Sequence, residues 1–262
     1  MEFQFGFVVS DQPVEYYMQF ARNNGLSHLE IDLAKEHSQL TSFDAKRVAN
    51  LKKLCSQYPV SLSVHAPYKL NLADRSGGVM DFLAGTIELA KNLEARFITV
   101  YPGSFARQKE PAAARKRALN SALKSLGEAA ELCASRKLKL AIENTNRMPK
   151  DSEIFYLGDN LKDLAQIFRE IDSPVLKLCL DLGHAHLNEG ILKYIDRFRE
   201  RIISVHFHDN DGKSDDHLDV GEGSINWKQT LKALAKIKFY GPLLSETRES
   251  PAQSKRKLLE YL

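Results

Sequence analysis

Residues 175–185 read VLKLCLDLGHA, an apolar run that ends in an aspartate and a histidine. Short runs rich in Leu, Val, Ile and Phe are typical of strands that are buried on both faces. Seven more runs of this kind recur along the chain, each followed by a segment with helical spacing. With 175–181, the predicted strands are 3–9, 27–33, 60–65, 96–101, 138–143, 202–208 and 241–246.

The alternation of strands and helices predicts the fold class. In 79–94 and 112–135, apolar side chains recur every three to four residues, as on the buried face of a helix. Eight strand–helix units within 262 residues fit an α/β fold of the closed (β/α)8 TIM barrel type. A doubly wound open sheet is the alternative, but a glycine-rich first turn is missing. We expect residues 1–262 to form a single domain.

Composition excludes several classes of protein. Hydrophobic residues make up 43% and charged residues 27%, so a large core can form. No apolar run is long enough to span a membrane, and the start of the chain lacks the basic region of a secretory signal. The net charge of +3 is too mild to indicate nucleic-acid binding by itself. Cys55, Cys133 and Cys179 have no CxxC spacing, so we interpret them as reduced thiols and expect a cytoplasmic protein.

Polar residues gather where the predicted strands end. In a barrel of this type, functional groups come from the C-terminal ends of the strands. Six of the eight histidines lie in or just after such ends. The strand-end segments are HAPY at 65–68, ENT at 143–145, DLGH at 181–184, HFHDNDG at 206–212 and Glu246.

Three of these carboxylates interrupt apolar strands. Glu143, Asp181 and Glu246 would each be costly to bury without a partner, and together they would repel one another. Each alone could be a salt-bridge partner, and His206 alone could be a hydrogen-bonded core histidine. Together they form a mixed oxygen and nitrogen set that suits Mn, Mg, Co, Fe or Zn. His208 lies two residues after His206 and should face the same side of the strand.

The ordered series of motifs resembles one known family. It resembles the xylose isomerase-like barrel superfamily, which includes sugar epimerases and isomerases and the endonuclease IV type of DNA repair enzymes. The matching segments are HAPY at 65–68, YPGS at 101–104, IENT at 142–145, LDLGHA at 180–185, HFHDNDG at 206–212, DDHLDVGEG at 215–223 and PLLSET at 242–247.

The single-metal members of this superfamily imply roles for particular residues. The resemblance implies that one divalent metal ion (Mn, Mg, Co or Zn) is held by Glu143, Asp181, His206 and Glu246. It also implies that Glu143 and Glu246 act as the catalytic acid/base pair. The residues expected to bind substrate are His65, Tyr68, His184 and Lys213.

The endonuclease branch, which uses three metals, is the alternative. Most of its ligand positions are kept, but Tyr101 stands where that branch has histidine, and a phenol with a pKa of about 10 is a poor ligand at neutral pH. His184, Asp215 and His217 could form a second metal site, or the 211–223 loop could simply close over the substrate. The basic clusters at 107–109, 115–117 and 255–257 are interpreted as solvated surface rather than as a DNA track.

The leading hypothesis is therefore a metal-dependent isomerase or epimerase. Its substrate would be a small sugar, a keto-polyol or a sugar phosphate, and its intermediate an enediolate. The alternatives are metal-dependent hydrolysis at abasic DNA sites and a non-catalytic sugar-binding role. The resemblance also implies self-association. The 146–158 segment has no periodicity and is expected to be a long loop, a lid or an interface.

Overall fold

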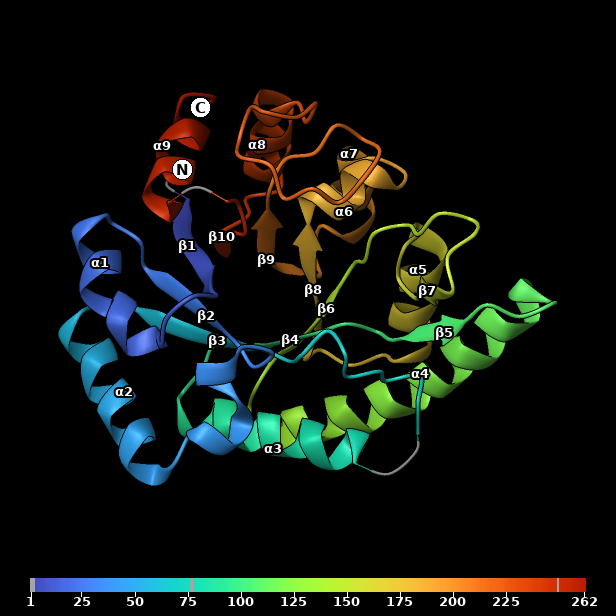
Figure 1. The fold of residues 1–262 in the computed structure, drawn as a ribbon, viewed down its shortest axis with the longest axis horizontal. Helices are drawn as coiled ribbons and strands as arrows, with labels where there is room; N and C mark the ends of the chain where they lie inside the picture. The colour runs from blue at the N-terminus through green and yellow to red at the C-terminus, as the bar shows by residue number, and fades with distance from the viewer. Residues whose placement is uncertain (1–2, 76–77, 249) are drawn as a thin grey trace.

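Eight parallel strands close into a barrel in this computed structural model, which describes residues 3–75, 78–248 and 250–262. Around the barrel, the order is β1, β10, β9, β8, β6, β4, β3 and β2 (Figure 1). The barrel strands are β1 (Gln4–Val9), β2 (His28–Asp32), β3 (Ser61–His65), β4 (Ile98–Val100), β6 (Leu140–Glu143), β8 (Leu176–Asp181), β9 (Ile202–Phe207) and β10 (Pro242–Ser245). The predicted (β/α)8 fold is confirmed, and each predicted strand end lies within two residues of its observed position.

Helices surround the barrel (Figure 1). They are α1 (Tyr17–Asn23), α2 (Ala45–Gln57), α3 (Val79–Asn92), α4 (Pro111–Ser135), α5 (Leu161–Glu170), α6 (Leu182–Leu187), α7 (Ile191–Phe198), α8 (Trp227–Lys236) and α9 (Pro251–Leu259). Short 3-10 turns lie at η1 (Val14–Tyr16), η2 (Glu36–Ser38) and η3 (Leu40–Ser42). Helix starts follow local rules, because Asp44 caps α2 through its side chain and Pro111 opens α4. Helices α3 and α4 confirm that the periodic segments 79–94 and 112–135 are helical.

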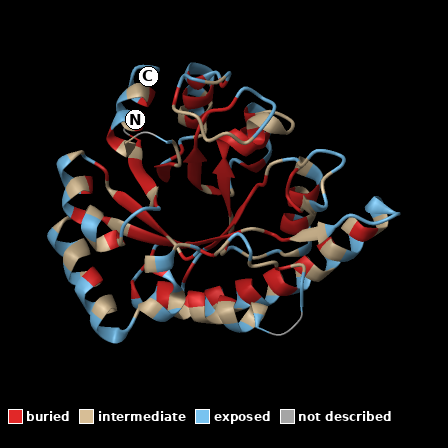
Figure 2. Ribbon diagram, viewed as in Figure 1, coloured by how far each residue is buried: buried red, intermediate tan, exposed pale blue. Residues whose placement is uncertain are grey.

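Burial is concentrated in the barrel strands and on the inner faces of the helices (Figure 2). The strands read as apolar runs because helices cover one side of them and the barrel interior covers the other. Polar residues interrupt this core at the inward positions of β2, β3, β4, β6 and β9, where Glu30, Ser63, Thr99, Glu143 and His206 are all buried.

The 146–158 segment is more ordered than the sequence indicates. Within it, β7 (Ile154–Tyr156) pairs antiparallel with β5 (Ser104–Ala106) beside the barrel.

Arg115 of α4 contacts the carboxylates of Asp159 and Asp163, with a 2.6 Å bond to the latter, and its side chain is only 26% exposed. The interpretation of 115–117 as solvated surface is therefore wrong at Arg115, because Asp159 before α5 and Asp163 within α5 supply two acidic partners that the sequence pattern did not pair with it.

A glycine allows the close approach of strands at β1. A Cβ atom on Gly6 would lie 2.1 Å from the backbone oxygen of His28 and 2.8 Å from Leu244 Cδ2. Gly127, in the interior of α4, has open space around the corresponding position. The two glycines therefore offer a matched test of barrel packing.

We predict that Gly6→Ala lowers the free energy of unfolding by about 1–3 kcal/mol, because a backbone oxygen cannot move aside without shifting a strand. Gly127→Ala should instead raise it by about 0.5–1 kcal/mol, since alanine loses less entropy in a helix. Thermal or denaturant unfolding of both variants measures the difference. Equal effects in the two variants would contradict the close packing at β1.

Candidate metal centre

Four predicted ligands converge at the C-terminal end of the barrel. Glu143 and Asp181 are the last residues of β6 and β8, and Glu246 follows β10 directly. His206 lies in β9, in register with Asp181 on the neighbouring strand. The side chains of Glu143, Asp181 and His206 are completely buried, and that of Glu246 is 16% exposed. The strand register therefore brings together residues from distant parts of the chain, since Glu143 and Glu246 are more than 100 positions apart.

The imidazole of His206 lies among the carboxylates. Its Nδ1 atom is 3.1 Å from Glu246 Oε1 and 3.4 Å from Glu143 Oε2. Ligand atoms of Asp181, His206 and Glu246 all lie within 4.8 Å of one another. Among the described residues, three buried atoms here lack a hydrogen-bond partner: His206 Nδ1, Glu143 Oε1 and Asp181 Oδ2. Buried polar atoms are normally paired, so these donor atoms fit a divalent cation.

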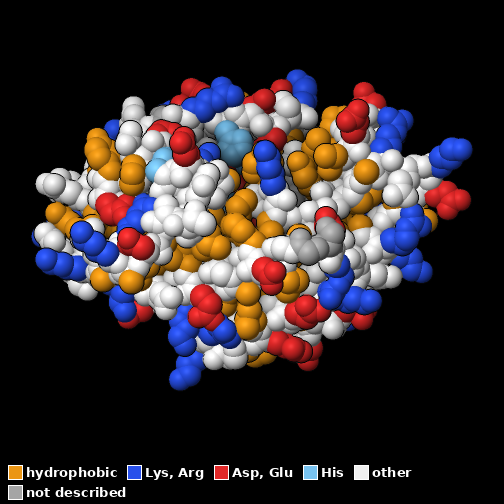
Figure 3. Space-filling model, turned by 60° about the horizontal axis from the view of Figure 1, so that its bottom comes forward, with side chains coloured by type: hydrophobic (Ala, Val, Ile, Leu, Met, Phe, Trp, Pro, Cys, Tyr) orange, Lys and Arg blue, Asp and Glu red, His pale blue; other side chains and the backbone are white. Residues whose placement is uncertain are grey.

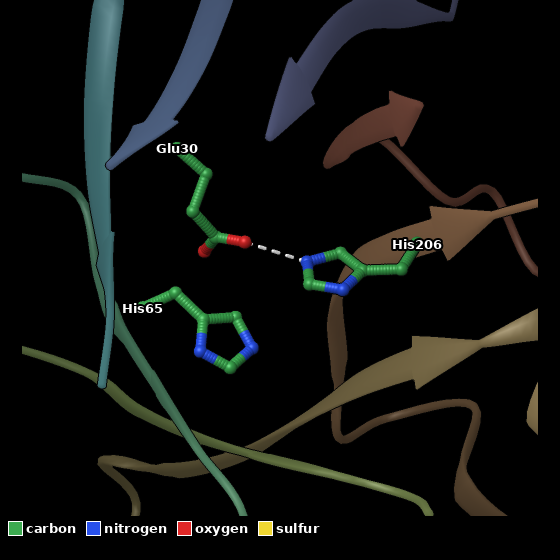
Figure 4. Close-up of side chains that lie close together, drawn as sticks. All are labelled: Glu30, His65 and His206. Carbon is green, nitrogen blue, oxygen red and sulfur yellow. Dashed lines mark hydrogen bonds and ion pairs between the residues drawn. The ribbon is translucent and has the colours of Figure 1, made fainter. Parts of the chain in front are cut away.

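His206 and His65 each have one nitrogen fixed by an acceptor. His206 Nε2 lies 2.6 Å from Glu30 Oε2, which is drawn as a dashed line in Figure 4. His65 Nδ1 lies 2.7 Å from the carbonyl oxygen of Ala66, so this nitrogen carries a proton. The other nitrogen of His65 lies 2.8 Å from Glu143 Oε2. In both rings, the second nitrogen faces the cluster of carboxylates.

A second cluster lies beside the first. His184 Nδ1 donates to the carbonyl oxygen of Asn144 at 2.8 Å, and its Nε2 atom is 3.2 Å from Asp215 Oδ2. His217 Nε2 is 3.7 Å from the same oxygen. His208 stacks on His217 with ring centroids 4.0 Å apart. The sequence-predicted group of His184, Asp215 and His217 is thus brought together, and His208 joins it.

His208 is fully buried and faces inward, as its spacing from His206 predicts. Its Nε2 atom is 3.3 Å from Asp181 Oδ1 and 3.6 Å from Asp215 Oδ1. Neither ring nitrogen has a hydrogen-bond partner among the described residues. Gly183 makes room for this ring, because a Cβ atom there would lie 2.0 Å from His208 Cε1.

The charges in the cluster shift the pKa values of its members in opposite directions. Burial opposes ionisation of Glu143, but the positive charge of His206 lowers the pKa of this carboxyl to about 2. Burial and His206 act in the same way on Glu246, whose pKa is also about 2. The hydrogen bond and charge of Glu143 raise the pKa of His65 to about 9 despite its burial. The pKa of His206 lies well above its usual value, because the carboxylates outweigh burial. Without a metal, protons on the histidines therefore offset the carboxylates.

Two pockets that share several lining residues lie beside the cluster. The larger, of about 420 Å³, is bordered by His65, Tyr68, Tyr101, His217 and Glu246, and also by Asp32, Lys35 and Arg248. The smaller, of about 170 Å³, is bordered by Tyr68, Tyr101, His184, Asp215, His217 and Glu246. Among the predicted substrate-binding residues, His65, Tyr68 and His184 therefore border a pocket. Lys213 does not: its side chain is 83% exposed and lies 3.0 Å from Asp211.

Sequence reasoning missed Glu30 as a member of the site. Glu30 comes from the middle of β2 and is completely buried against His206. Its signal was present in the segment SHLEIDL, where His28, Glu30 and Asp32 alternate with apolar residues. Alternation of this kind places all three side chains on the same face of a strand, here the barrel interior.

The chain matches a known family. The model of the xylose isomerase-like TIM barrel family matches residues 18–262, and the chain belongs to this family. The uncharacterized protein MJ1311 of Methanocaldococcus jannaschii is 30% identical over 227 residues, which cover 83% of this chain and 75% of that protein. A probable endonuclease 4 of Mesomycoplasma hyopneumoniae strain J is 30% identical over 196 residues, covering 69% of this chain and 65% of that protein.

Solved structures are similar over almost the whole chain. A D-tagatose 3-epimerase-like protein has a TM-score of 0.85 and 28% identity, covering 98% of this chain and 96% of its own. The IOLI protein with a bound zinc atom has a TM-score of 0.80 at 15% identity, covering 98% and 97%, which supports the fold.

In the part of the chain that the structure describes, no helix is both long and apolar enough to cross a bilayer. On the face drawn in Figure 3, acidic and basic side chains are interspersed around exposed histidine. Among the described residues drawn there, the basic side chains form no continuous track of the kind that neutralises DNA phosphates.

We predict that divalent metal binding releases protons at neutral pH. The histidines are protonated in the metal-free protein because their pKa values are raised, whereas a metal ligand must be a neutral imidazole. The apparent affinity should therefore rise with pH, by about tenfold per pH unit for each proton released. Calorimetric titration with Mn²⁺ in buffers of different ionisation enthalpy counts the protons. An affinity that does not change between pH 6 and 8 would contradict this charge balance.

Proposed function

We propose that this protein is a divalent-metal-dependent epimerase or isomerase of a small sugar, a keto-polyol or a sugar phosphate. The observation that carries the proposal is the convergence of Glu143, Asp181, His206 and Glu246, of which Glu246 borders both pockets, with buried donor atoms that lack partners. The likeness to the D-tagatose 3-epimerase-like structure over 98% of the chain supports the reaction class. The proposal treats residues 1–262 as one domain.

The four ligands would hold the cation through oxygen and nitrogen atoms. A bound divalent cation would polarise neighbouring carbonyl and hydroxyl oxygens of the substrate and so acidify the adjacent C–H bond. Glu246 borders both pockets and is ionised, so its carboxylate is the group placed to remove that proton. The product of this step is an enediolate.

Glu143 is the partner that would return a proton to the other face of the same carbon or to its neighbour. It is buried behind the pocket wall, and His65 Nε2 lies 2.8 Å from its Oε2 atom. This contact with His65 would hold the Glu143 carboxyl in a fixed orientation, and the proton that Glu143 returns to carbon would be one exchanged with solvent. His184 and Tyr68 border the smaller pocket and would orient substrate oxygens.

We predict that Glu143→Gln and Glu246→Gln each lower kcat by about 10³-fold or more, because the amide cannot exchange a proton with carbon. Glu131→Gln, on the exposed face of α4, is the matched control and should keep full activity. The assay follows ketohexose interconversion and deuterium uptake from D₂O at the reacting carbon. Near-normal exchange in either site variant would remove that glutamate from the mechanism.

A second candidate is metal-assisted phosphodiester hydrolysis at abasic DNA sites. The observation that favours it is the second cluster, in which nitrogen atoms of His184, His208 and His217 face the carboxylate of Asp215. The likeness to probable endonuclease 4 of Mesomycoplasma hyopneumoniae also supports this second candidate. Tyr101 argues against it, because burial raises the pKa of this phenol well above 10 and keeps it protonated.

Metal counting and DNA incision separate the two functions. We predict about one tightly bound metal per chain by plasma mass spectrometry, and no cleavage of a duplex that carries an abasic site. Two or three metals per chain together with incision would favour the hydrolase. One metal together with keto-sugar turnover would favour the epimerase or isomerase.

A further inference from the structure

Glu30 is a carboxylate within the barrel that no step of the proposed reaction uses. It lies on β2 with no exposed surface and borders neither of the two pockets. An isolated buried carboxylate is costly, so its contacts must compensate for lost hydration. Figure 4 shows its side chain directed toward His206 across the barrel interior.

Three hydrogen bonds fix the orientation of this carboxylate. Thr99 Oγ1 donates to Glu30 Oε1 at 2.7 Å, and Ser63 Oγ donates to the same oxygen at 3.0 Å. The other oxygen, Oε2, accepts from His206 Nε2 at 2.6 Å. His28 Nε2 lies 2.8 Å from Ser63 Oγ, and because that hydroxyl donates its proton to Glu30, it accepts from His28. Hydrogen bonds from Ser63 on β3 and Thr99 on β4 therefore hold the Glu30 carboxylate in the orientation in which it contacts His206.

In the hydrogen bond between Glu30 and His206, the histidine is the donor. Both oxygens of Glu30 act as acceptors, because Oε1 receives hydrogen bonds from the hydroxyl groups of Ser63 and Thr99 and Oε2 lies 2.6 Å from His206 Nε2. His206 Nε2 must therefore carry a proton, whereas Nδ1 is the nitrogen that faces Glu143 and Glu246. In this tautomer, a neutral His206 presents its lone pair at Nδ1 to the cluster of carboxylates.

We propose that Glu30 is a positioning residue that makes His206 a metal ligand through Nδ1. Glu30 fixes the ring orientation and the tautomer, and its negative charge makes Nδ1 a stronger donor. The inference rests on the proposed function only in that a metal binds at Glu143, Asp181, His206 and Glu246. Loss of a carboxylate partner of a metal-bound histidine typically weakens metal binding by about 10–100-fold, and we expect an effect of this size.

The first test is Glu30→Gln, which keeps the side-chain shape and removes the charge. Dissociation constants for Co²⁺ are measured by the absorption of the bound ion, with Glu131→Gln as the control and thermal unfolding to verify the fold. We expect a weakening of about 10–100-fold in Glu30→Gln and no change in the control. Equal Co²⁺ affinities in wild type and Glu30→Gln would overturn the role of Glu30.

A second measurement needs no variant and separates positioning from a purely structural role. Wild-type protein with ¹⁵N-labelled histidine is loaded with ¹¹³Cd²⁺, and the coupling between cadmium and the imidazole nitrogens of His206 is recorded. Coupling to Nδ1 supports the inference, and coupling to Nε2 overturns it, even if Glu30→Gln fails to fold. A wild-type protein that binds neither Co²⁺ nor Cd²⁺ would overturn the proposed function as well. If the wild type binds metal and Glu30→Gln binds it with the same affinity, only the role of Glu30 is overturned.

Discussion

The contact between one imidazole and the surrounding carboxylates governs the rest of the site. His206 is completely buried, with Glu30 on one side of its ring and Glu143 and Glu246 on the other. These residues come from four strands, so the closed barrel is what brings them together. Without positive charge between them, the carboxylates would repel one another strongly in an environment of low dielectric.

Two kinds of positive charge can fill this role. In the metal-free protein, protons on His65 and His206 balance the carboxylates, which is why the pKa values of these histidines rise while those of Glu143 and Glu246 fall. A divalent cation would replace protons rather than add to them. The same residues that balance their charges through protons could therefore also hold a metal ion.

The sequence was informative wherever a local rule applied. Apolar runs placed every barrel strand, and the strand-end residues Glu143, Asp181, His206 and Glu246 do meet. It failed where a contact depends on distant partners. Nothing local indicates that Glu30 on β2 lies against His206 on β9, because 176 residues separate them. Lys213 follows β9 closely, yet a turn carries its side chain into solvent beside Asp211.

Tyr101 shows how burial and nearby charges determine what one side chain can contribute to a site. Burial and the charges of Glu143 and Glu246 raise the pKa of its phenol, so the hydroxyl stays protonated. A protonated phenol donates a hydrogen bond and coordinates a divalent metal poorly. Its ring lies 5.2 Å from that of His65 and borders both pockets. Tyr101 therefore places a protonated phenol, which can donate a hydrogen bond, at the border of both pockets.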